Sequence, residues 1–264
     1  ITFTGTFPTG ANTTTTVASG KTLTLAASKA SLQKITGAGT TNITSLQAGS
    51  QLNQINTNTV TVTSPNDITF TGSFPTGATT TTTVNSGKTL TLAASLASGK
   101  TMAGEGTTAI TALNADANLE NVNSTTVTIA VSDNVTFGGK FPTGATTTTT
   151  VASGKTLTLD ASLASGKTMA GEGTTSITAL KANTNLANVN STTVTITVSD
   201  DITFESNFPT GATTTTTVTS GKTLTLAASK ASLQKITGVG TTNITSLQAG
   251  SQLNQINANT VTVT

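Results

Sequence analysis

The chain has no cysteine, histidine, tryptophan, tyrosine or arginine among its 264 residues. Without histidine and cysteine it lacks the commonest general base and the thiol nucleophile, and its ten carboxylates are scattered along the sequence. We therefore expect no enzyme activity, no catalytic residues, no resident metal and no cofactor. The absence of cysteine also excludes disulfides, which fits a bacterial extracellular protein but fits many intracellular chains equally well.

Charge is also scarce, since charged residues make up 8% of the chain and the net charge is +2. The lysines do not cluster and exposed aromatics are few, so we expect no nucleic-acid partner. No apolar run approaches the roughly 18 to 20 residues that a membrane-spanning helix needs, so we expect no membrane span. Threonine, valine and isoleucine are abundant instead, which predicts an ordered all-β chain rather than a disordered one.

The dominant positive feature is a fourfold sequence repeat that no insertion interrupts. Phe-Pro-Thr-Gly begins at positions 7, 74, 141 and 208, and Ser-Gly-Lys-Thr-Leu-Thr-Leu begins at positions 19, 86, 153 and 220. The repeats are 1–67, 68–134, 135–201 and 202–264, and we expect one continuous array over 1–264. Separate small β-sandwich domains are the rival arrangement, but a repeat of this length is short for that fold. The sequence begins and ends inside its own pattern, so we expect a segment of something longer.

Within a repeat, short segments alternate apolar and polar residues with a period of two, as half-buried β-strands do. The predicted strands of the first repeat are residues 1–4, 13–17, 21–25, 34–36, 42–46 and 59–63. This pattern predicts a β-solenoid (β-helix) of about three coils per 67-residue repeat, with coils of roughly 22 residues stacked at about 4.8 Å. Leucine 25 and its equivalents at positions 92, 159 and 226 should line the interior.

The segments between these strands carry turn signals. Phe7–Gly10 predicts a type I turn, and the glycines at 20, 37 and 39 are expected to supply positive φ angles. Residues 25–32 are rich in alanine but cover only about two helical turns, so the helix signal is weak. Phe3 and Phe7 are the bulkiest side chains of the repeat, and we expect them to fill one corner.

The repeats come in two versions, in the order A, B, B, A. The A repeats carry Lys-Ala-Ser-Leu-Gln-Lys-Ile from positions 29 and 230, and the B repeats carry Leu-Ala-Ser-Gly-Lys-Thr-Met from positions 96 and 163. Met102 and Met169 thus replace Ile35 and Ile236. Because this exchange nearly conserves volume, it predicts an inward-facing position.

Several of these segments together carry a resemblance to a known class of proteins. Residues 19–28, the turns at 35–40 and 102–107, and the strands at 43–46 and 59–63 resemble the Thr-rich repeat regions of giant adhesin-like surface proteins of Gram-negative bacteria. The resemblance covers all four repeats. It implies an extracellular or cell-surface structural protein, either a filament subunit or an adhesin stalk. Its expected partners are copies of itself or further repeats of the same chain, joined end to end.

Calcium is the first alternative to a purely structural role. The best candidate ligands are the acidic residues at the repeat junctions, Asp67, Asp133, Asp200 and Asp201. Calcium takes six to eight oxygen ligands, and no junction offers that many carboxylates, so we favour structural turns there. Glu105 and its equivalent at position 172 each lie between two glycines, and we expect them to be exposed.

A second alternative is binding to a cell-surface polysaccharide through lysines. The evenly spaced lysines that follow each Ser-Gly turn are Lys21, Lys88, Lys155 and Lys222. Clustered on one surface they would attract an anionic polysaccharide. The structural interpretation is a solvated turn whose charge discourages edge-to-edge aggregation.

A third alternative is an ice- or carbohydrate-binding module that uses threonine arrays. Thr-x-Thr pairs occur at 22–24 and 59–61, and an unbroken threonine run occupies 79–83. Because these segments fall at irregular intervals, we expect them to lie on several faces of the solenoid. A single flat rank of threonines would favour the binding module, whereas threonines spread over all faces would count against it.

Overall fold

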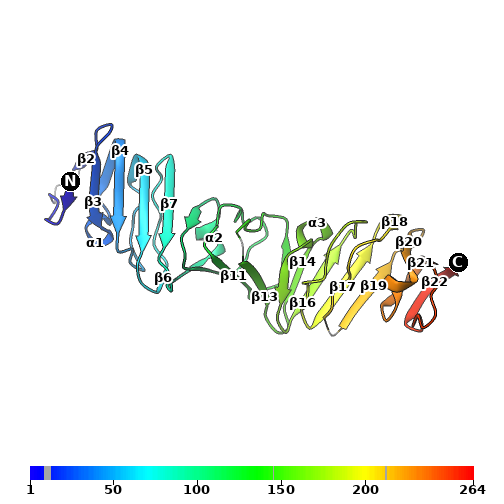
Figure 1. Cartoon of the computed structure of the whole chain (residues 1–264). Coiled ribbons are helices and arrows are strands. Elements are labelled where there is room, and N and C mark those ends of the chain that lie inside the picture. The colour runs from blue at the N-terminus through cyan, green and yellow to red at the C-terminus, as the bar shows by residue number, and fades with distance from the viewer. Residues whose placement is uncertain (9–12, 145, 212) are drawn as a thin grey trace. The chain divides into compact units, whose positions relative to one another are not determined.

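The computed structural model describes residues 1–8, 13–144, 146–211 and 213–264 (Figure 1). It is an all-β chain, 6% helical, whose parallel strands stack as a β-solenoid of about 13 turns. The fold class predicted from the sequence is therefore confirmed. No helix in the described ranges is long and apolar enough to cross a membrane.

The contacts between residues divide the chain into two compact units. The first comprises 1–113, 117–129 and 140–147, and the second comprises 114–116, 130–139 and 148–264. The division falls around the junction of the second and third repeats. The continuity of the array over the whole chain stays a prediction.

Short parallel strands make up both compact units. The strands of the first unit are β1 (Thr2–Phe3), β2 (Thr14–Thr16), β3 (Thr22–Ala26), β4 (Lys34–Thr44), β5 (Ile55–Ser64), β6 (Ile68–Phe70), β7 (Thr79–Val84), β8 (Thr89–Ala93), β9 (Thr101–Ala103) and β10 (Thr107–Thr111). The strands with residues in both units are β11 (Thr126–Val131) and β13 (Thr146–Val151). The remaining strands are β12 (Val135–Phe137), β14 (Thr156–Asp160), β15 (Thr168–Ala170), β16 (Thr174–Thr178), β17 (Thr193–Val198), β18 (Ile202–Thr203), β19 (Thr213–Val218), β20 (Thr223–Ala227), β21 (Lys235–Thr245) and β22 (Ile256–Val263).

The register between stacked strands sets the length of a coil. The chain passes the same position on successive coils at Thr2, Thr24, Asn42, Thr61 and Thr81. The intervals between these positions are unequal, and a coil is roughly 20 residues long, slightly shorter than the length expected from the sequence. One repeat therefore spans three coils and about a third of the next.

Because a repeat does not contain a whole number of coils, corresponding strands of successive repeats begin different stacks. In the first compact unit β1 pairs with β3 in one sheet, whereas β6, its equivalent in the second repeat, pairs with β8 in another. In the second unit β12 stacks on β14 and its equivalent β18 stacks on β20, and β21 joins these two stacks because its first half pairs with β19 and its second half with β20. The outer surface of one repeat is thus not continued by the same surface of the next repeat.

The interior consists of apolar side chains stacked in register from coil to coil. Leu25 pairs with Ile43, and Ile43 pairs with Val62, and each is at most 1% exposed. Burying such a side chain contributes roughly 1.5 to 3 kcal/mol to stability. The four leucines predicted to line the interior are buried, and so are the residues of the methionine–isoleucine exchange: Leu25, Leu92, Leu159, Leu226, Met102, Met169, Ile35 and Ile236. Both predictions are confirmed.

Paired phenylalanines fill one corner of the coil, as the sequence predicts. The rings of Phe70 and Phe74 lie 4.5 Å apart between centroids, and both side chains are buried. Phe204 and Phe208 repeat this arrangement at the same separation. The tilted contact adds a favourable ring–ring interaction to the burial of two large side chains.

A single helical turn follows strand β3 and its equivalents. The helices are α1 (Ala27–Ala30), α2 (Ala94–Ala97), α3 (Ala161–Ala164) and α4 (Ala228–Ala231). Residues 25–32 predict about two turns, but Leu25 and Ala26 belong to the preceding strand. Leu32 leaves the helical region with a φ of 65°, so one turn remains between the strand and the corner.

The conformation of the Phe-Pro-Thr-Gly segment differs from the type I turn predicted from the sequence. Residues 9 and 10 of its first copy lie outside the described residues, but Phe74–Gly77 of the second repeat shows its conformation. The N–H of Thr76 donates to the carbonyl oxygen of Ile55 on the preceding coil at 3.0 Å, and the chain bends at Gly77 and Ala78. The expected type I turn is not formed at Phe74–Gly77, since no backbone hydrogen bond from Gly77 to Phe74 closes this segment.

Glycines at the corners serve two different purposes. Gly20 has a φ of 69° and open space around it, so there the prediction of a positive φ is confirmed. Gly37 also has a positive φ, of 122°. Gly39 does not, but a Cβ at Gly39 would lie 2.4 Å from the carbonyl oxygen of Ala18. Gly39 is required by the close approach of two backbones rather than by its own dihedral angle.

Buried hydroxyl pairs connect neighbouring coils inside the solenoid. The pairs are Thr41–Thr57 at 2.9 Å, Thr108–Ser124 at 2.6 Å and Thr175–Ser191 at 2.6 Å. The equivalent in the fourth repeat is Thr242, whose Oγ1 is buried without a partner because Ala258 replaces the second hydroxyl. Three repeats therefore satisfy this buried hydroxyl and the fourth does not.

Candidate functional site

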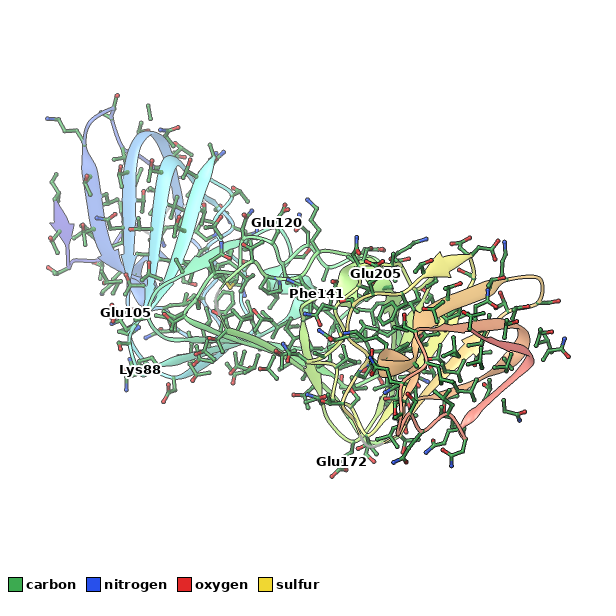
Figure 2. The ribbon with its side chains drawn as sticks, turned by 45° about the vertical axis from the view of Figure 1, so that its right-hand side comes forward. Lys88, Glu105, Glu120, Phe141, Glu172 and Glu205 are labelled. Atoms are coloured by element: carbon green, nitrogen blue, oxygen red, sulfur yellow. The ribbon has the colours of Figure 1, made fainter. Side chains whose placement is uncertain are left out.

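The acidic side chains do not gather into a catalytic or metal-binding centre. No group of three or more histidine, cysteine, aspartate or glutamate residues that could hold a metal ion exists in the part of the chain that the structure describes. Glu105 and Glu172 are exposed, as predicted, and project from the ribbon in Figure 2. The glycines beside Glu105 are needed structurally, because a Cβ at Gly104 would lie 2.3 Å from the carbonyl oxygen of Val84.

The junction aspartates bind the backbone of the following coil. Oδ1 of Asp67 accepts a hydrogen bond of 2.7 Å from the N–H of Thr89, and Oδ1 of Asp201 accepts one of 2.7 Å from Thr223. Asn134 occupies the equivalent position at the end of the second repeat and makes the same contact, at 2.9 Å, with the N–H of residue 156. A neutral side chain thus suffices for this role, which supports the structural interpretation of the junctions over calcium binding.

The other two junction aspartates form exposed ion pairs. The ion pairs between described residues are Lys155–Asp133 at 3.6 Å, Lys181–Asp200 at 3.1 Å and Lys140–Glu120 at 2.6 Å. Exposed pairs of this kind contribute little to stability because water and salt screen them. They engage the carboxylates one at a time with lysine, instead of converging them on a cation.

Two carboxyl groups have pKa values that are shifted downwards. Hydrogen bonds from Lys140 and then from Asn118 lower the pKa of Glu120. The side chain and the backbone N–H of Ser162 lower the pKa of Asp160, which caps α3. Both shifts favour the charged carboxylate, whereas a general acid needs a raised pKa. Neither residue therefore has the electrostatic environment of a catalytic acid.

The evenly spaced lysines stand at equivalent corners but not in one row. In the first compact unit Lys21 precedes β3 and Lys88 precedes β8, and these strands belong to different sheets. The backbone carbonyl groups of these lysines help to hold neighbouring coils together. The carbonyl oxygen of Lys21 accepts a hydrogen bond from the N–H of Thr40 at 2.9 Å, and that of Lys88 accepts one from the N–H of Thr107 at 2.8 Å. The regular spacing in the sequence thus reflects a repeated corner of the coil.

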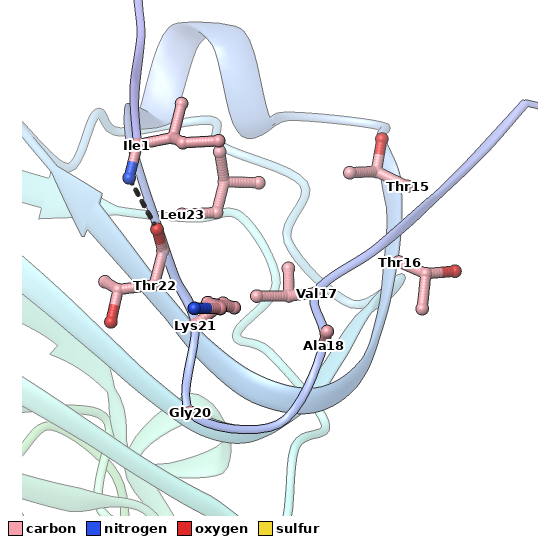
Figure 3. A pocket seen from close by; sticks show the side chains of 9 residues that line it. All are labelled: Ile1, Thr15, Thr16, Val17, Ala18, Gly20, Lys21, Thr22 and Leu23. Atoms are coloured by element: carbon pink, nitrogen blue, oxygen red, sulfur yellow. Dashed lines mark hydrogen bonds between the residues drawn. The ribbon is translucent and has the colours of Figure 1, made fainter.

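One opening lies beside the first coil. It has a volume of about 410 Å³ and is lined by Ile1, residues 15–18 and residues 20–23 (Figure 3). Its walls are mainly aliphatic and carry no acidic group. Val17 and Leu23 are slightly exposed here, whereas the equivalents of both in the second repeat are fully buried. The opening belongs to this coil and is not a repeated feature.

A smaller polar groove recurs next to the Phe-Pro-Thr-Gly corner. In the second repeat the groove has a volume of about 240 Å³ and is lined by residues 75–80 and 99–101. In the fourth repeat it has a volume of about 390 Å³, and its lining includes Pro209 and Leu233. The A repeat places an exposed leucine where the B repeat has Gly99. The groove contains hydroxyl and amide groups but no acid–base pair, so it offers no catalytic arrangement.

The most regular chemical feature of the surface is an array of threonines on strands β3, β4, β5 and β7, which lie side by side in Figure 1. We define the threonine face as two ranks and a short third one: Thr22, Thr40, Thr59 and Thr79; Thr24, Asn42, Thr61 and Thr81; Thr63 and Thr83. Each rank runs from coil to coil in register, and none of these side chains is buried. The expectation that these threonine segments lie on different faces is wrong.

The physical reason is the variable length of the coils. Thr22, Thr40, Thr59 and Thr79 are successive neighbours along one rank, although the intervals between them in the sequence are unequal. Irregular spacing in the sequence therefore becomes a straight rank in space. The second compact unit has a counterpart face with the same layout: Thr156, Thr174, Thr193 and Thr213; Thr158, Ser176, Thr195 and Thr215; Thr197 and Thr217.

The central rank of the threonine face is connected by side-chain hydrogen bonds. Thr61 Oγ1 donates to Asn42 Oδ1 at 2.8 Å, and Asn42 Nδ2 donates to Thr24 Oγ1 at 3.5 Å. β-Branched side chains already have restricted χ1 angles, and these bonds restrict the rank further. The face is thus an ordered, uncharged grid of hydroxyl and methyl groups.

Comparison with known proteins leaves the function open, because no family model, no curated protein and no solved structure matches the chain. The features that sequence reasoning missed are the buried hydroxyl pairs and the alignment of the threonines. The first left a trace in the sequence, since position 57 is threonine or serine in three repeats and alanine in the fourth. The second required the register of every coil.

Proposed function

We propose that the chain is a structural segment of an extracellular rod, either the stalk of an adhesin-like surface protein or part of a filament. The observation that carries the proposal is the stacking of parallel strands, strand on strand, over a repeated apolar interior within each compact unit. In a solenoid each coil contacts mainly its neighbours, so adding repeats adds length without disturbing the rest. Reach and stiffness, rather than a pocket, are what such a chain provides.

Stiffness arises from the many bonds between successive coils. The backbones of paired strands form parallel hydrogen-bond ladders, for example over six residues between β5 and β7. Side chains add further bonds, as where Ser73 Oγ donates to Gln51 Oε1 at 2.9 Å. Separating two coils breaks these bonds together and exposes the apolar interior to water. Bending or extending the rod is therefore costly.

The surface suits life outside the cell. Some connections between strands are short, such as the three residues between β5 and β6, and short connections offer few sites for proteolytic nicking. Stability without cysteine makes the fold independent of disulfide formation. Low charge and abundant threonine keep the surface hydrated without strong repulsion between neighbouring molecules.

Further coils are the expected partners of this segment. Val261 and Val263 on β22 are 42% and 46% exposed, whereas their equivalents Val60 and Val62 in the first repeat are fully buried. In the first repeat β7 stacks on β5 and provides the cover. A further repeat of the same chain, or a copy of it, would cover β22 in the same way and continue the rod.

Electron microscopy of two chain lengths tests this proposal. One sample is the chain itself, and the other carries a second copy of residues 68–134 inserted after residue 134. We expect unbranched rods, and the longer chain should gain about 16 Å per added repeat, given strand spacings of about 4.8 Å. Beads separated by flexible joints, or a globular particle that widens instead of lengthening, would contradict the proposal.

A further inference from the structure

We propose that the threonine face is an ice-binding surface, a function beyond the structural role. The surface comprises the ten side chains of the threonine face, nine of them threonine, on four adjacent strands of the first compact unit. None of the ten is buried and none is charged. The inference depends on the lattice that these groups form and on their chemistry.

The lattice is two-dimensional and regular. Along a strand, alternate residues such as Thr59, Thr61 and Thr63 point to the same side and lie about 6.6 Å apart. Across strands, the next member of each rank lies about 4.8 Å away. Nine of the ten lattice points carry a hydroxyl group, which donates and accepts hydrogen bonds, beside a methyl group, and the tenth carries the amide of Asn42. A grid of this kind can hold a layer of water molecules in fixed positions, which is what adsorption to a crystal of water requires.

Order in the free protein favours binding to a rigid lattice. The strands under the face are fixed by parallel ladders, and the central rank is held by the bonds that join Thr24, Asn42 and Thr61. A surface that is already ordered loses little conformational entropy when it adsorbs. Exposed side chains of lysine or glutamate, by contrast, would have to be immobilised at a cost in entropy.

The composition of the face favours ice over a crystalline polysaccharide. Flat sugar rings are recognised largely through aromatic side chains that present a broad apolar plane. The ten positions of the face contain no aromatic residue, and Phe70 and Phe74 of the same compact unit are buried. An uncharged grid of hydroxyl and methyl groups matches a lattice made of water alone.

Inhibition of ice recrystallisation by the full chain tests the proposal. The test variant carries Thr61→Lys, Thr81→Lys, Thr195→Lys and Thr215→Lys, which place charges in the central ranks of the threonine face and its counterpart. The matched control carries four lysines at exposed asparagines outside both faces: Asn53→Lys, Asn56→Lys, Asn66→Lys and Asn85→Lys. A third variant replaces the same four threonines with valine, which keeps the β-branched shape and removes the hydroxyl. Circular dichroism verifies that each variant retains the β-fold.

We expect the unmodified chain and the asparagine control to inhibit recrystallisation at similar concentrations. The four-lysine test variant should require at least a fivefold higher concentration, and the valine variant should fall between them. A shorter rank formed by Thr89, Thr107 and Thr126 accounts for residual activity. Three results would overturn the proposal: an inactive unmodified chain, equal losses in the test variant and the control, or adsorption to crystalline cellulose or chitin but not to ice.

Discussion

The first and fourth repeats make an instructive comparison because they differ at seven of the 63 positions they share. The differing pairs are Thr4/Glu205, Gly5/Ser206, Thr6/Asn207, Asn12/Thr213, Ala18/Thr219, Ala38/Val239 and Thr57/Ala258. Among the described residues of the first repeat that differ, Thr57 is the one that is buried. Substitution has therefore been tolerated at the surface, whereas one interior change has removed a hydrogen bond.

That change shows how a solenoid distributes its stability. Thr57 Oγ1 contacts Thr41 Oγ1 at 2.9 Å and the carbonyl oxygen of Thr59 at 3.0 Å. In the fourth repeat the corresponding Thr242 hydroxyl is buried and unpaired. An unsatisfied buried polar group costs about 1 to 3 kcal/mol, so the fourth repeat should be locally weaker than the first although their backbones match.

The largest expected effect comes from removing interior volume in both repeats. Leu25→Ala and Leu226→Ala should each lower the free energy of unfolding by about 3 kcal/mol, because both side chains are 1% exposed and leave a cavity. Native-state hydrogen exchange would measure the loss coil by coil. Leu32→Ala is the matched control, since that leucine is 67% exposed and its removal should cost below about 0.5 kcal/mol. If Leu226→Ala lowered the free energy of unfolding much less than Leu25→Ala, the interiors of the first and fourth repeats would not be equivalent.

Corner glycines should come next in magnitude. Gly37→Ala and Gly238→Ala should each cost about 2 kcal/mol, because their φ angles are positive and a Cβ would lie within 2.3 Å of a backbone oxygen. Gly20→Ala provides the control. It shares a positive φ but has open space, so we expect a loss of about 1 kcal/mol. Equal losses at all three positions in thermal unfolding would show that the close approach is unimportant.

Exchanging the residues at the buried hydroxyl pair should reverse the difference in local stability between the first and fourth repeats. Thr57→Ala should destabilise the first repeat by about 1 kcal/mol, and Ala258→Thr should stabilise the fourth by a similar amount. Hydrogen exchange of amides on β4 and β21 reports each effect locally. If Ala258→Thr left β21 unprotected while Thr57→Ala weakened β4, the hydroxyl pair would not be the cause of the difference.

The third repeat has a side-chain cap at the start of its helix, which the other repeats lack. Asp160 accepts hydrogen bonds from Ser162 at the start of α3, and alanine stands at the equivalent positions of the other repeats. Asp160→Ala should therefore cost about 0.5 kcal/mol or less, at the low end for an exposed cap.

The pH dependence of that cap has a defined sign. Since the pKa of Asp160 is lowered from its usual 3.8, its stabilising contribution is complete above that value and is lost as pH falls through the lower folded-state pKa. Thermal unfolding of wild type and Asp160→Ala at pH 7 and at pH 2 to 3 measures this. The difference between them should shrink in acid, and a difference that grows in acid would contradict the assignment.

The smallest effect is expected at the surface. Ala38→Val introduces the residue of the fourth repeat into the first, and Val239 is 65% exposed. The change should alter the free energy of unfolding by less than about 0.5 kcal/mol in denaturant titration. A loss above about 1 kcal/mol would mean that this corner is packed more tightly than its exposure indicates.

Much of the fold follows from local sequence rules. The alternation of Leu23 and Leu25 with threonine predicts both the strand and the buried face, and the exchange of Met102 for Ile35 identifies an interior position. These features are legible because side-chain direction in a strand depends on neighbouring residues alone. The glycine at position 20 is predictable for the same reason.

What the sequence could not provide was the register over a whole coil. The neighbour of Thr24 along the axis is Asn42, and that of Asn42 is Thr61, and no local rule specifies these unequal steps. For this reason the threonine face could not be predicted from the sequence. The hydrogen bond of Asp67 could not be predicted either, since its partner Thr89 lies on the next coil, far along the sequence. Candidate sites on a solenoid depend on such long-range neighbours.

The most direct test of this account measures the coil length through introduced thiols, because the chain has no cysteine of its own. One variant carries Thr61→Cys and Thr81→Cys, which are paired between β5 and β7, and the other carries Thr61→Cys and Thr83→Cys. The thiol-bridging reagent dibromobimane becomes fluorescent when it joins two thiols a few ångströms apart. Stacking of position 81 directly on position 61 places the first pair about 5 Å apart and the second about 8 Å apart, so the first should react much faster. Faster reaction of the second pair would contradict the register, and with it the threonine face.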